Sequence, residues 1–136
     1  MSENQSIVAA VYASFNSGDI DGALALLDAD IVWHERDSVD GFVVGGTHHG
    51  PQGVLAGVFA QVPAYFEDFR VDVDRYHDAG DTIVAEARYV GTARGGEPLD
   101  VAVTHIWTIA GGRVVRHAAY PDTATFVAVL DSVPVA

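Results

Sequence analysis

Two polar residues in the last third of the chain have side chains that suit proton transfer. His105 lies within the apolar run Val101–Ile109, and Asp122 follows a second run that is joined to the first at Gly111-Gly112. Desolvation lowers the pKa of an imidazole in apolar surroundings and a nearby carboxylate raises it, so His105 could act as a donor or an acid near neutral pH. If both side chains face one cavity, Asp122 could serve as a base.

Each of these two residues also has a purely structural interpretation. His105 would then be a core histidine that is hydrogen-bonded to a backbone carbonyl or to a tyrosine hydroxyl. Asp122 is followed by Thr123 and Ala124 in a sequence typical of a helix N-cap, where the carboxylate accepts a backbone N–H two or three residues further on. The local pattern favours the cap for Asp122 and does not decide for His105.

A second pair of candidates lies earlier in the chain. His34 and Glu35 are adjacent in the stretch Asp30–Asp37, whose β-branched and aromatic residues predict a strand. Neighbouring residues of a strand point to opposite faces, so at most one of the two faces a cavity, and their apolar neighbours do not decide which one. The alternative for Glu35 is a surface salt bridge with Arg36 or Arg70.

Other kinds of site are not indicated by the sequence. His48 and His49 are adjacent, but neighbouring histidines rarely bind one ion together and no further ligand stands at a metal-site spacing, so we expect no metal. The motifs of phosphate-binding loops, dinucleotide-binding folds and Ser-His-Asp triads are missing.

The composition is that of one globular chain. The 136 residues are 49% apolar, include no cysteine and carry a net charge of −12, and all seven basic residues are arginines. This length predicts a single domain over residues 1–136, and the negative charge argues against a nucleic-acid partner. No apolar run is long enough to span a membrane and the start of the chain has no signal-peptide pattern, so we expect a cytoplasmic protein without a membrane partner.

The elements that would position these residues follow an α+β order. Apolar residues at helical spacing predict helices around residues 8–15 and 20–27, from Pro51 to Pro63, and over 123–131. Alternating patterns predict antiparallel strands around residues 69–74, 82–92, 99–109 and 113–120. Residues 40–50 predict a glycine-rich loop with a short extended piece around 42–44. Helices laid across the concave side of a twisted antiparallel sheet would leave a pocket.

These stretches resemble a known group of proteins. Three of them carry the resemblance: "FNSGDIDGALALLDADIVWHE", "HHGPQGV" and "THIWTIAGGRVVRHAAYPDTATF". They resemble the SnoaL-like group of the nuclear-transport-factor-2-like superfamily, which also includes ketosteroid isomerase, and the resemblance covers nearly the whole chain. It implies a cone-shaped domain with a curved, mixed, mostly antiparallel sheet wrapped around N-terminal helices, an enclosed apolar pocket, and homodimers formed through the sheet.

The resemblance also implies roles for individual residues. In SnoaL-like polyketide cyclases the general acid/base is the aspartate of a Y-x-D pattern after the last strand, which here is Asp122. Two further pocket positions of those enzymes match His105 and His34. In ketosteroid isomerase the base lies on the first strand, where Glu35 stands, and an oxyanion-binding residue falls at His105. The tyrosine of its first helix falls near Val11, and the valine at this position departs from the ketosteroid isomerase pattern.

These observations together predict a cofactor-independent acid/base enzyme that acts on a small apolar carbonyl compound, as an isomerase or by aldol chemistry of the polyketide-cyclase type. Asp122 would be the base and His105 the hydrogen-bond donor or proton shuttle. His34 or Glu35 would make a secondary polar contact. We expect four aromatic residues to line the pocket: Trp33, Phe59, Trp107 and Tyr120. The alternative is a non-catalytic small-molecule-binding or dimeric assembly module of the same fold.

Overall fold

The computed structural model of the chain describes residues 1–36 and 45–134. Its elements are α1 (Glu3–Asn16), α2 (Ile20–Ala25), β1 (Leu27–Glu35), β2 (Gly46–His49), α3 (Gly50–Gly57), the 3₁₀ helix η1 (Phe59–Gln61), α4 (Val62–Tyr65), β3 (Phe66–Ala79), β4 (Thr82–Ala93), β5 (Pro98–Ala110), β6 (Arg113–Pro121) and α5 (Thr123–Asp131). The predicted order of helices followed by four long antiparallel strands is confirmed. The extended piece predicted around residues 42–44 lies outside the described residues. No helix in the described part of the chain is long and apolar enough to cross a membrane.

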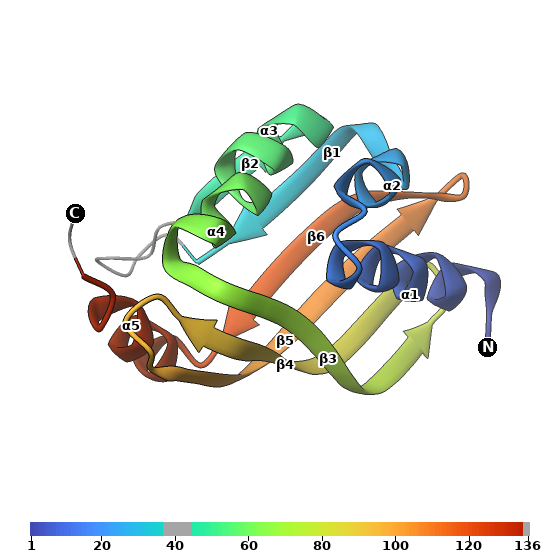
Figure 1. Cartoon of the computed structure of the whole chain (residues 1–136). Coiled ribbons are helices and arrows are strands. Elements are labelled where there is room, and N and C mark those ends of the chain that lie inside the picture. Colours follow the sequence, from blue (N-terminus) through green and yellow to red (C-terminus); the bar gives the residue numbers. More distant parts are fainter. Residues whose placement is uncertain (37–44, 135–136) are drawn as a thin grey trace.

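The strands form one six-stranded sheet in the order β2-β1-β6-β5-β4-β3. The pairing of β1 with β6 is parallel and the other four pairings are antiparallel. Helices α1 to α4 lie over one face of the curved sheet, and α5 lies at one end of it (Figure 1). The prediction of an α+β fold with a mixed, mostly antiparallel sheet is therefore confirmed.

The boundary between α2 and β1 differs from the prediction. The second helix ends at Ala25, and Leu27 already belongs to a strand, pairing with Val114 of β6. The backbone carbonyl of Leu26 accepts the N–H of Val114 at 3.0 Å. Tertiary pairing with β6 thus ends the helix earlier than the apolar pattern indicates.

The helix predicted from Pro51 to Pro63 is divided into three short pieces. It is interrupted at Val58, whose φ of −123° and ψ of −69° are not helical. Pro63 then stands in the first turn of α4 instead of ending a helix, a position where its missing N–H breaks no hydrogen bond. The interruption turns Val58 and Phe59 toward the sheet, where both are buried.

Strand β6 contains one extra residue within the segment that pairs with β5. Thr108 of β5 pairs with Arg116 and Ile109 pairs with Val114, so Val115 is the extra residue of a β-bulge. A slip of one residue turns every following side chain to the other face of the sheet. His117 consequently lies on the helix side of the sheet and is fully buried.

Candidate functional site

A cavity of about 80 Å³ lies between the sheet and the helices. Most of its lining residues are apolar or aromatic, and they come from α1, β1, the segment 58–62, the strands β3 to β6, and α5. The lining residues with polar side-chain atoms, apart from the tryptophans, are Tyr12, Glu35, Gln61, Tyr89, His105 and His117. This mixture of an apolar wall with a few polar groups is typical of a small-molecule site.

Glu35 supplies a carboxyl group to this cavity. Side chains alternate along β1, so Trp33 and Glu35 face the helices and are buried. The Glu35 carboxylate accepts a hydrogen bond from Trp33 Nε1 at 2.8 Å. Burial raises the pKa of Glu35 to about 7, although the hydrogen bond from Trp33 acts in the opposite direction. The carboxyl group can therefore take up and release a proton near neutral pH.

His105 is the centre of a hydrogen-bonded network of aromatic side chains. Its Nδ1 lies 2.6 Å from the hydroxyl of Tyr12, and its Nε2 lies 2.8 Å from the hydroxyl of Tyr89. The Tyr12 hydroxyl also accepts a hydrogen bond from Trp107 Nε1 at 2.9 Å. Burial lowers the pKa of His105 to about 3, so the ring is neutral at pH 7. The partners of His105 are tyrosine hydroxyls, as the structural interpretation of this residue predicted.

His105 and the two tyrosines together carry one more hydrogen than the two imidazole contacts use. Neutral His105 carries one N–H and each tyrosine carries one O–H, while the two contacts of the imidazole use only two of these three hydrogens. The tautomer of His105 decides whether the remaining hydrogen is on Tyr12 or on Tyr89. Both tyrosines line the cavity, so the network can donate one hydrogen bond to a ligand.

One strand separates Glu35 from His105. Trp33 pairs with His117 in the parallel ladder, so Glu35 lies at the level of Ala119, two residues further along both strands. Ala119 pairs with His105. Two strand spacings give ~10 Å between the backbones of Glu35 and His105. The methyl group of Ala119 adds little volume between them, so a ligand could contact both the carboxyl group and the hydroxyl network.

His117 is a second buried histidine of the cavity wall. Its ring stacks on Trp33 with the centroids 3.8 Å apart, and its centroid lies 4.7 Å from that of His105. Neither ring nitrogen has a hydrogen-bond partner among the described residues, and both nitrogens are covered by surrounding atoms. Burial, together with His105 and Arg116, lowers the pKa of His117 well below its usual value, so this ring is neutral as well.

The structure brings several of the predicted site residues together in the cavity. Glu35 and His105 line it, as do three of the four expected aromatic residues, Trp33, Phe59 and Trp107. The choice between the two adjacent candidates on the first strand is thereby made in favour of Glu35. His34 is only partly buried, and its Nδ1 lies 2.8 Å from Thr47 Oγ1 of the neighbouring strand β2.

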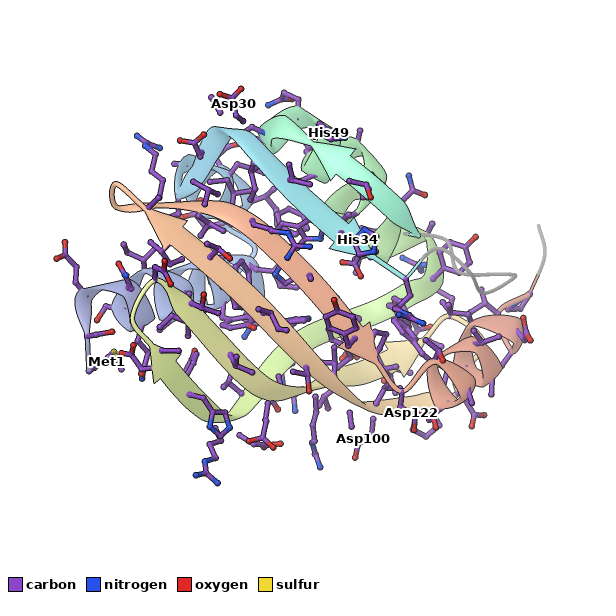
Figure 2. All side chains as sticks on the ribbon, turned by 180° about the vertical axis from the view of Figure 1, so that it is seen from behind. Met1, Asp30, His34, His49, Asp100 and Asp122 are labelled. Atoms are coloured by element: carbon purple, nitrogen blue, oxygen red, sulfur yellow. The ribbon has the colours of Figure 1, made fainter. Side chains whose placement is uncertain are left out.

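Asp122 and Tyr120 lie elsewhere, which corrects the expectation that they face the cavity with His105. Asp122 is exposed and caps α5, accepting the Thr125 N–H at 3.4 Å and the Thr125 hydroxyl at 2.8 Å. Tyr120 is 43% exposed. Figure 2 views the sheet from the side opposite the helices and labels His34 and Asp122 there, with Asp122 beside α5. The bulge at Val115 is the physical reason for their outward position, because it shifts the alternation of β6 by one residue and so turns Tyr120 and Asp122 to the outer face.

Tyr12 and Tyr89 were not predicted as site residues. Tyr12 belongs to the buried stripe of α1 and follows directly after Val11, near which the resemblance places a helix-one tyrosine. Tyr89 belongs to the buried, alternating face of β4. The signal that could have found them is their hydroxyl group, since a tyrosine in a buried stripe requires a hydrogen-bond partner.

The sequence matches the family model of the SnoaL-like domain over residues 8–117. The chain belongs to the SnoaL-like domain family. Among solved structures, a protein of unknown function with the nuclear-transport-factor-2-like fold from Burkholderia pseudomallei is 30% identical, with a TM-score of 0.88 over 96% of this chain and 98% of that one. TerC, co-crystallised with polyporic acid, is 26% identical, with a TM-score of 0.88 over 96% and 99% of the two chains.

A third similar structure agrees in fold alone. It is IdmH from Streptomyces antibioticus, provisionally named a polyketide cyclase, which is 24% identical with a TM-score of 0.78 over 94% of this chain and 98% of that one. No curated protein sequence matches the chain.

Proposed function

We propose that this SnoaL-like protein is a cofactor-independent acid/base enzyme that acts on a small apolar carbonyl compound. Glu35 is the proton acceptor, and the network of Tyr12, His105 and Tyr89 donates a hydrogen bond to the carbonyl oxygen. The observation that carries the proposal is the buried Glu35, whose pKa of about 7 lies near physiological pH, in one apolar cavity with an unused hydroxyl hydrogen.

The proposed reaction begins at the carbon next to the carbonyl group. Ionised Glu35 takes a proton from this carbon, the electron pair of the broken C–H bond forms a C=C bond, and the carbonyl oxygen gains the negative charge of an enolate. A preorganised hydroxyl donor in a water-poor cavity stabilises that charge. General acid/base assistance of this kind is typically worth ~10²–10⁴-fold in rate.

Two reaction types share this first step. In an isomerase, protonated Glu35 returns its proton to another carbon of the conjugated system. In an aldol cyclisation, the enolate carbon attacks a second carbonyl group of the same molecule, and protonated Glu35 gives its proton to the new alkoxide oxygen. The apolar wall of the cavity supports an apolar substrate in both cases, and the co-crystallisation of TerC with polyporic acid supports a small organic ligand.

The proposal can be tested without knowing the natural substrate. Removal of a proton next to a carbonyl exchanges that hydrogen for deuterium in D₂O, so exchange into acetophenone, measured by NMR, reports the first step directly. We expect the wild-type protein to accelerate exchange and Glu35→Gln to reduce the rate to that of buffer. A Glu86→Gln variant, which removes an exposed carboxylate, should retain the wild-type rate. Equal exchange rates in the wild type and Glu35→Gln would refute the assignment of Glu35.

A non-catalytic binding module is the second candidate function. The observation in its favour is the lining of the cavity, because an apolar wall with a few polar groups can hold and orient a small molecule whether or not Glu35 acts as a base. Binding of acetophenone with no acceleration of exchange would support this candidate.

We also propose a homodimer formed through the outer face of the sheet, where Tyr120 is exposed. A light-scattering mass of one chain would contradict it.

A further inference from the structure

The direction of the hydrogen bonds around His105 decides which tyrosine can donate to a ligand. Trp107 Nε1 can only donate, so the Tyr12 oxygen accepts that bond. Two arrangements of the remaining hydrogens are then possible. In the first, Tyr12 donates to Nδ1 of His105 and Nε2–H donates to Tyr89. In the second, Tyr89 donates to Nε2 and Nδ1–H donates to Tyr12.

The distribution of accepted hydrogen bonds favours the first arrangement. It gives each tyrosine oxygen one accepted hydrogen bond, whereas in the second the Tyr12 oxygen would accept two and the Tyr89 oxygen none. The distance of 2.6 Å between the Tyr12 oxygen and Nδ1 is compatible with a hydroxyl donor. A hydroxyl that accepts one hydrogen bond is polarised and donates more strongly.

We propose that the network is a one-way chain of donors, from Trp107 through Tyr12 and His105 to Tyr89, and that the Tyr89 hydroxyl donates the terminal hydrogen bond to a carbonyl oxygen of the ligand. The presence of a carbonyl ligand in the cavity rests on the proposed function. Tyr89 touches this ligand, and Tyr12 and His105 are positioning residues. Tyr12 on the first helix therefore does not donate to the ligand, because its hydrogen is already used in the bond to His105.

The surroundings of Tyr89 agree with a donor that keeps its proton. Burial, the nearby Glu35 and then Tyr12 raise the pKa of Tyr89 well above its usual value. The hydroxyl is therefore neutral at every pH at which the protein would work. None of the described residues that line the cavity is an arginine or a lysine, so a neutral carbonyl compound suits it better than an anion.

The first test is the tautomer of His105 in the wild-type protein without a ligand. Long-range ¹H–¹⁵N NMR spectra of the imidazole distinguish a protonated ring nitrogen from an unprotonated one. We expect a protonated Nε2 and an unprotonated Nδ1 at pH 7. A protonated Nδ1 would reverse the chain, make Tyr12 the terminal donor and overturn the proposal.

The second test compares two probes that differ only at the oxygen. Acetophenone carries a carbonyl group where ethylbenzene carries a methylene group. Their different hydration is the same for every variant, so the change in the ratio of their dissociation constants between variants measures the hydrogen bond. Tyr89→Phe should reduce the relative affinity for acetophenone by ~3- to 10-fold. The exposed control Tyr120→Phe should leave it unchanged, and Tyr12→Phe, which removes the hydroxyl that fixes the tautomer of His105, should also reduce it. A relative affinity that is the same in the wild type and in Tyr89→Phe would overturn the proposal.

A Glu35→Gln variant separates this inference from the proposed function. It should stop hydrogen exchange, while the preference for acetophenone should still depend on Tyr89 in this background, because Glu35 is not part of the donor chain. If the wild type shows no exchange but its preference still depends on Tyr89, the proposed function fails and the donor chain stands. If exchange depends on Glu35 but the preference does not depend on Tyr89, the proposed function stands and the donor chain fails.

Discussion

The unfolding free energy of a Glu35→Gln variant should increase relative to that of the wild type as the pH rises. Below about pH 4.5 the carboxyl group is protonated in both the folded and the unfolded chain, so its ionisation costs nothing. Between pH 4.5 and about 7 the folded protein keeps a proton that the unfolded chain has released, and stability falls as pH rises. Above about pH 7 both states are ionised and the full cost remains.

The size of this effect follows from the two pKa values. The difference between 4.5 and about 7, at ~1.4 kcal/mol for each pH unit, corresponds to ~3 kcal/mol of unfolding free energy. Glutamine is neutral at every pH and can still accept the hydrogen bond of Trp33. The difference in unfolding free energy between Glu35→Gln and the wild type should therefore grow by ~3 kcal/mol from pH 4.5 to pH 8.

Urea denaturation of both proteins at half-unit pH intervals measures this difference, because the other titrating groups contribute equally to both and cancel. Glu86 provides the control, since it is exposed and its hydrogen bond with His77 lowers its pKa. For Glu86→Gln the difference should stay nearly constant from pH 4.5 to pH 8, because a carboxyl group whose pKa is lowered from 4.5 changes the unfolding free energy only below about pH 4.5. A difference between Glu35→Gln and the wild type that stays constant from pH 4.5 to pH 8 would refute the claim that Glu35 is buried and titrates near neutrality.

Three further substitutions and one control test other contacts. Tyr12→Phe should lower the unfolding free energy in urea by ~1–3 kcal/mol for each buried group left unpartnered, namely Trp107 Nε1 and one imidazole nitrogen, whereas Tyr120→Phe should change it by less than ~0.5 kcal/mol. His117→Phe removes two buried nitrogens without partners, so the melting temperature should stay equal or rise, and a clear fall would contradict their assignment as unpaired. Asp122→Ala should lower the unfolding free energy by ~1 kcal/mol through loss of the cap and leave the exchange rate of acetophenone unchanged; a lost rate would return Asp122 to the catalytic site.

The sequence predicts the helices and strands well where one periodicity continues without competition. The stripe of α1 and the alternation of β4 and β5 identify which residues are buried, because each face of these elements meets a single environment. The predictions fail where tertiary contacts outweigh a local pattern. Leu27 continues a helical stripe in the sequence, yet its backbone pairs with β6.

The candidate site likewise contains features that local patterns predict and features that depend on tertiary contacts. The sequence identifies His105 as buried and Glu35 as one of two alternatives, but it does not decide which face of β1 is covered. That choice depends on α3, which packs against β1 from one side. The local patterns place Tyr12 in a helix and Tyr89 in a strand but give no role to their hydroxyl groups, because the partner of each hydroxyl, His105, comes from another element.

The single extra residue in β6 decides which side chains form the site. Without the bulge at Val115, the ladder that starts at the turn would pair Trp107 with Arg116 and would turn Asp122 toward the face of His105. An unpaired guanidinium would then be buried against Trp33, at a far higher cost than a neutral imidazole. The bulge places His117 there and leaves Arg116 exposed. A comparison of the two registers by the charge that each one buries would thus have selected the observed one and excluded Asp122 from the cavity.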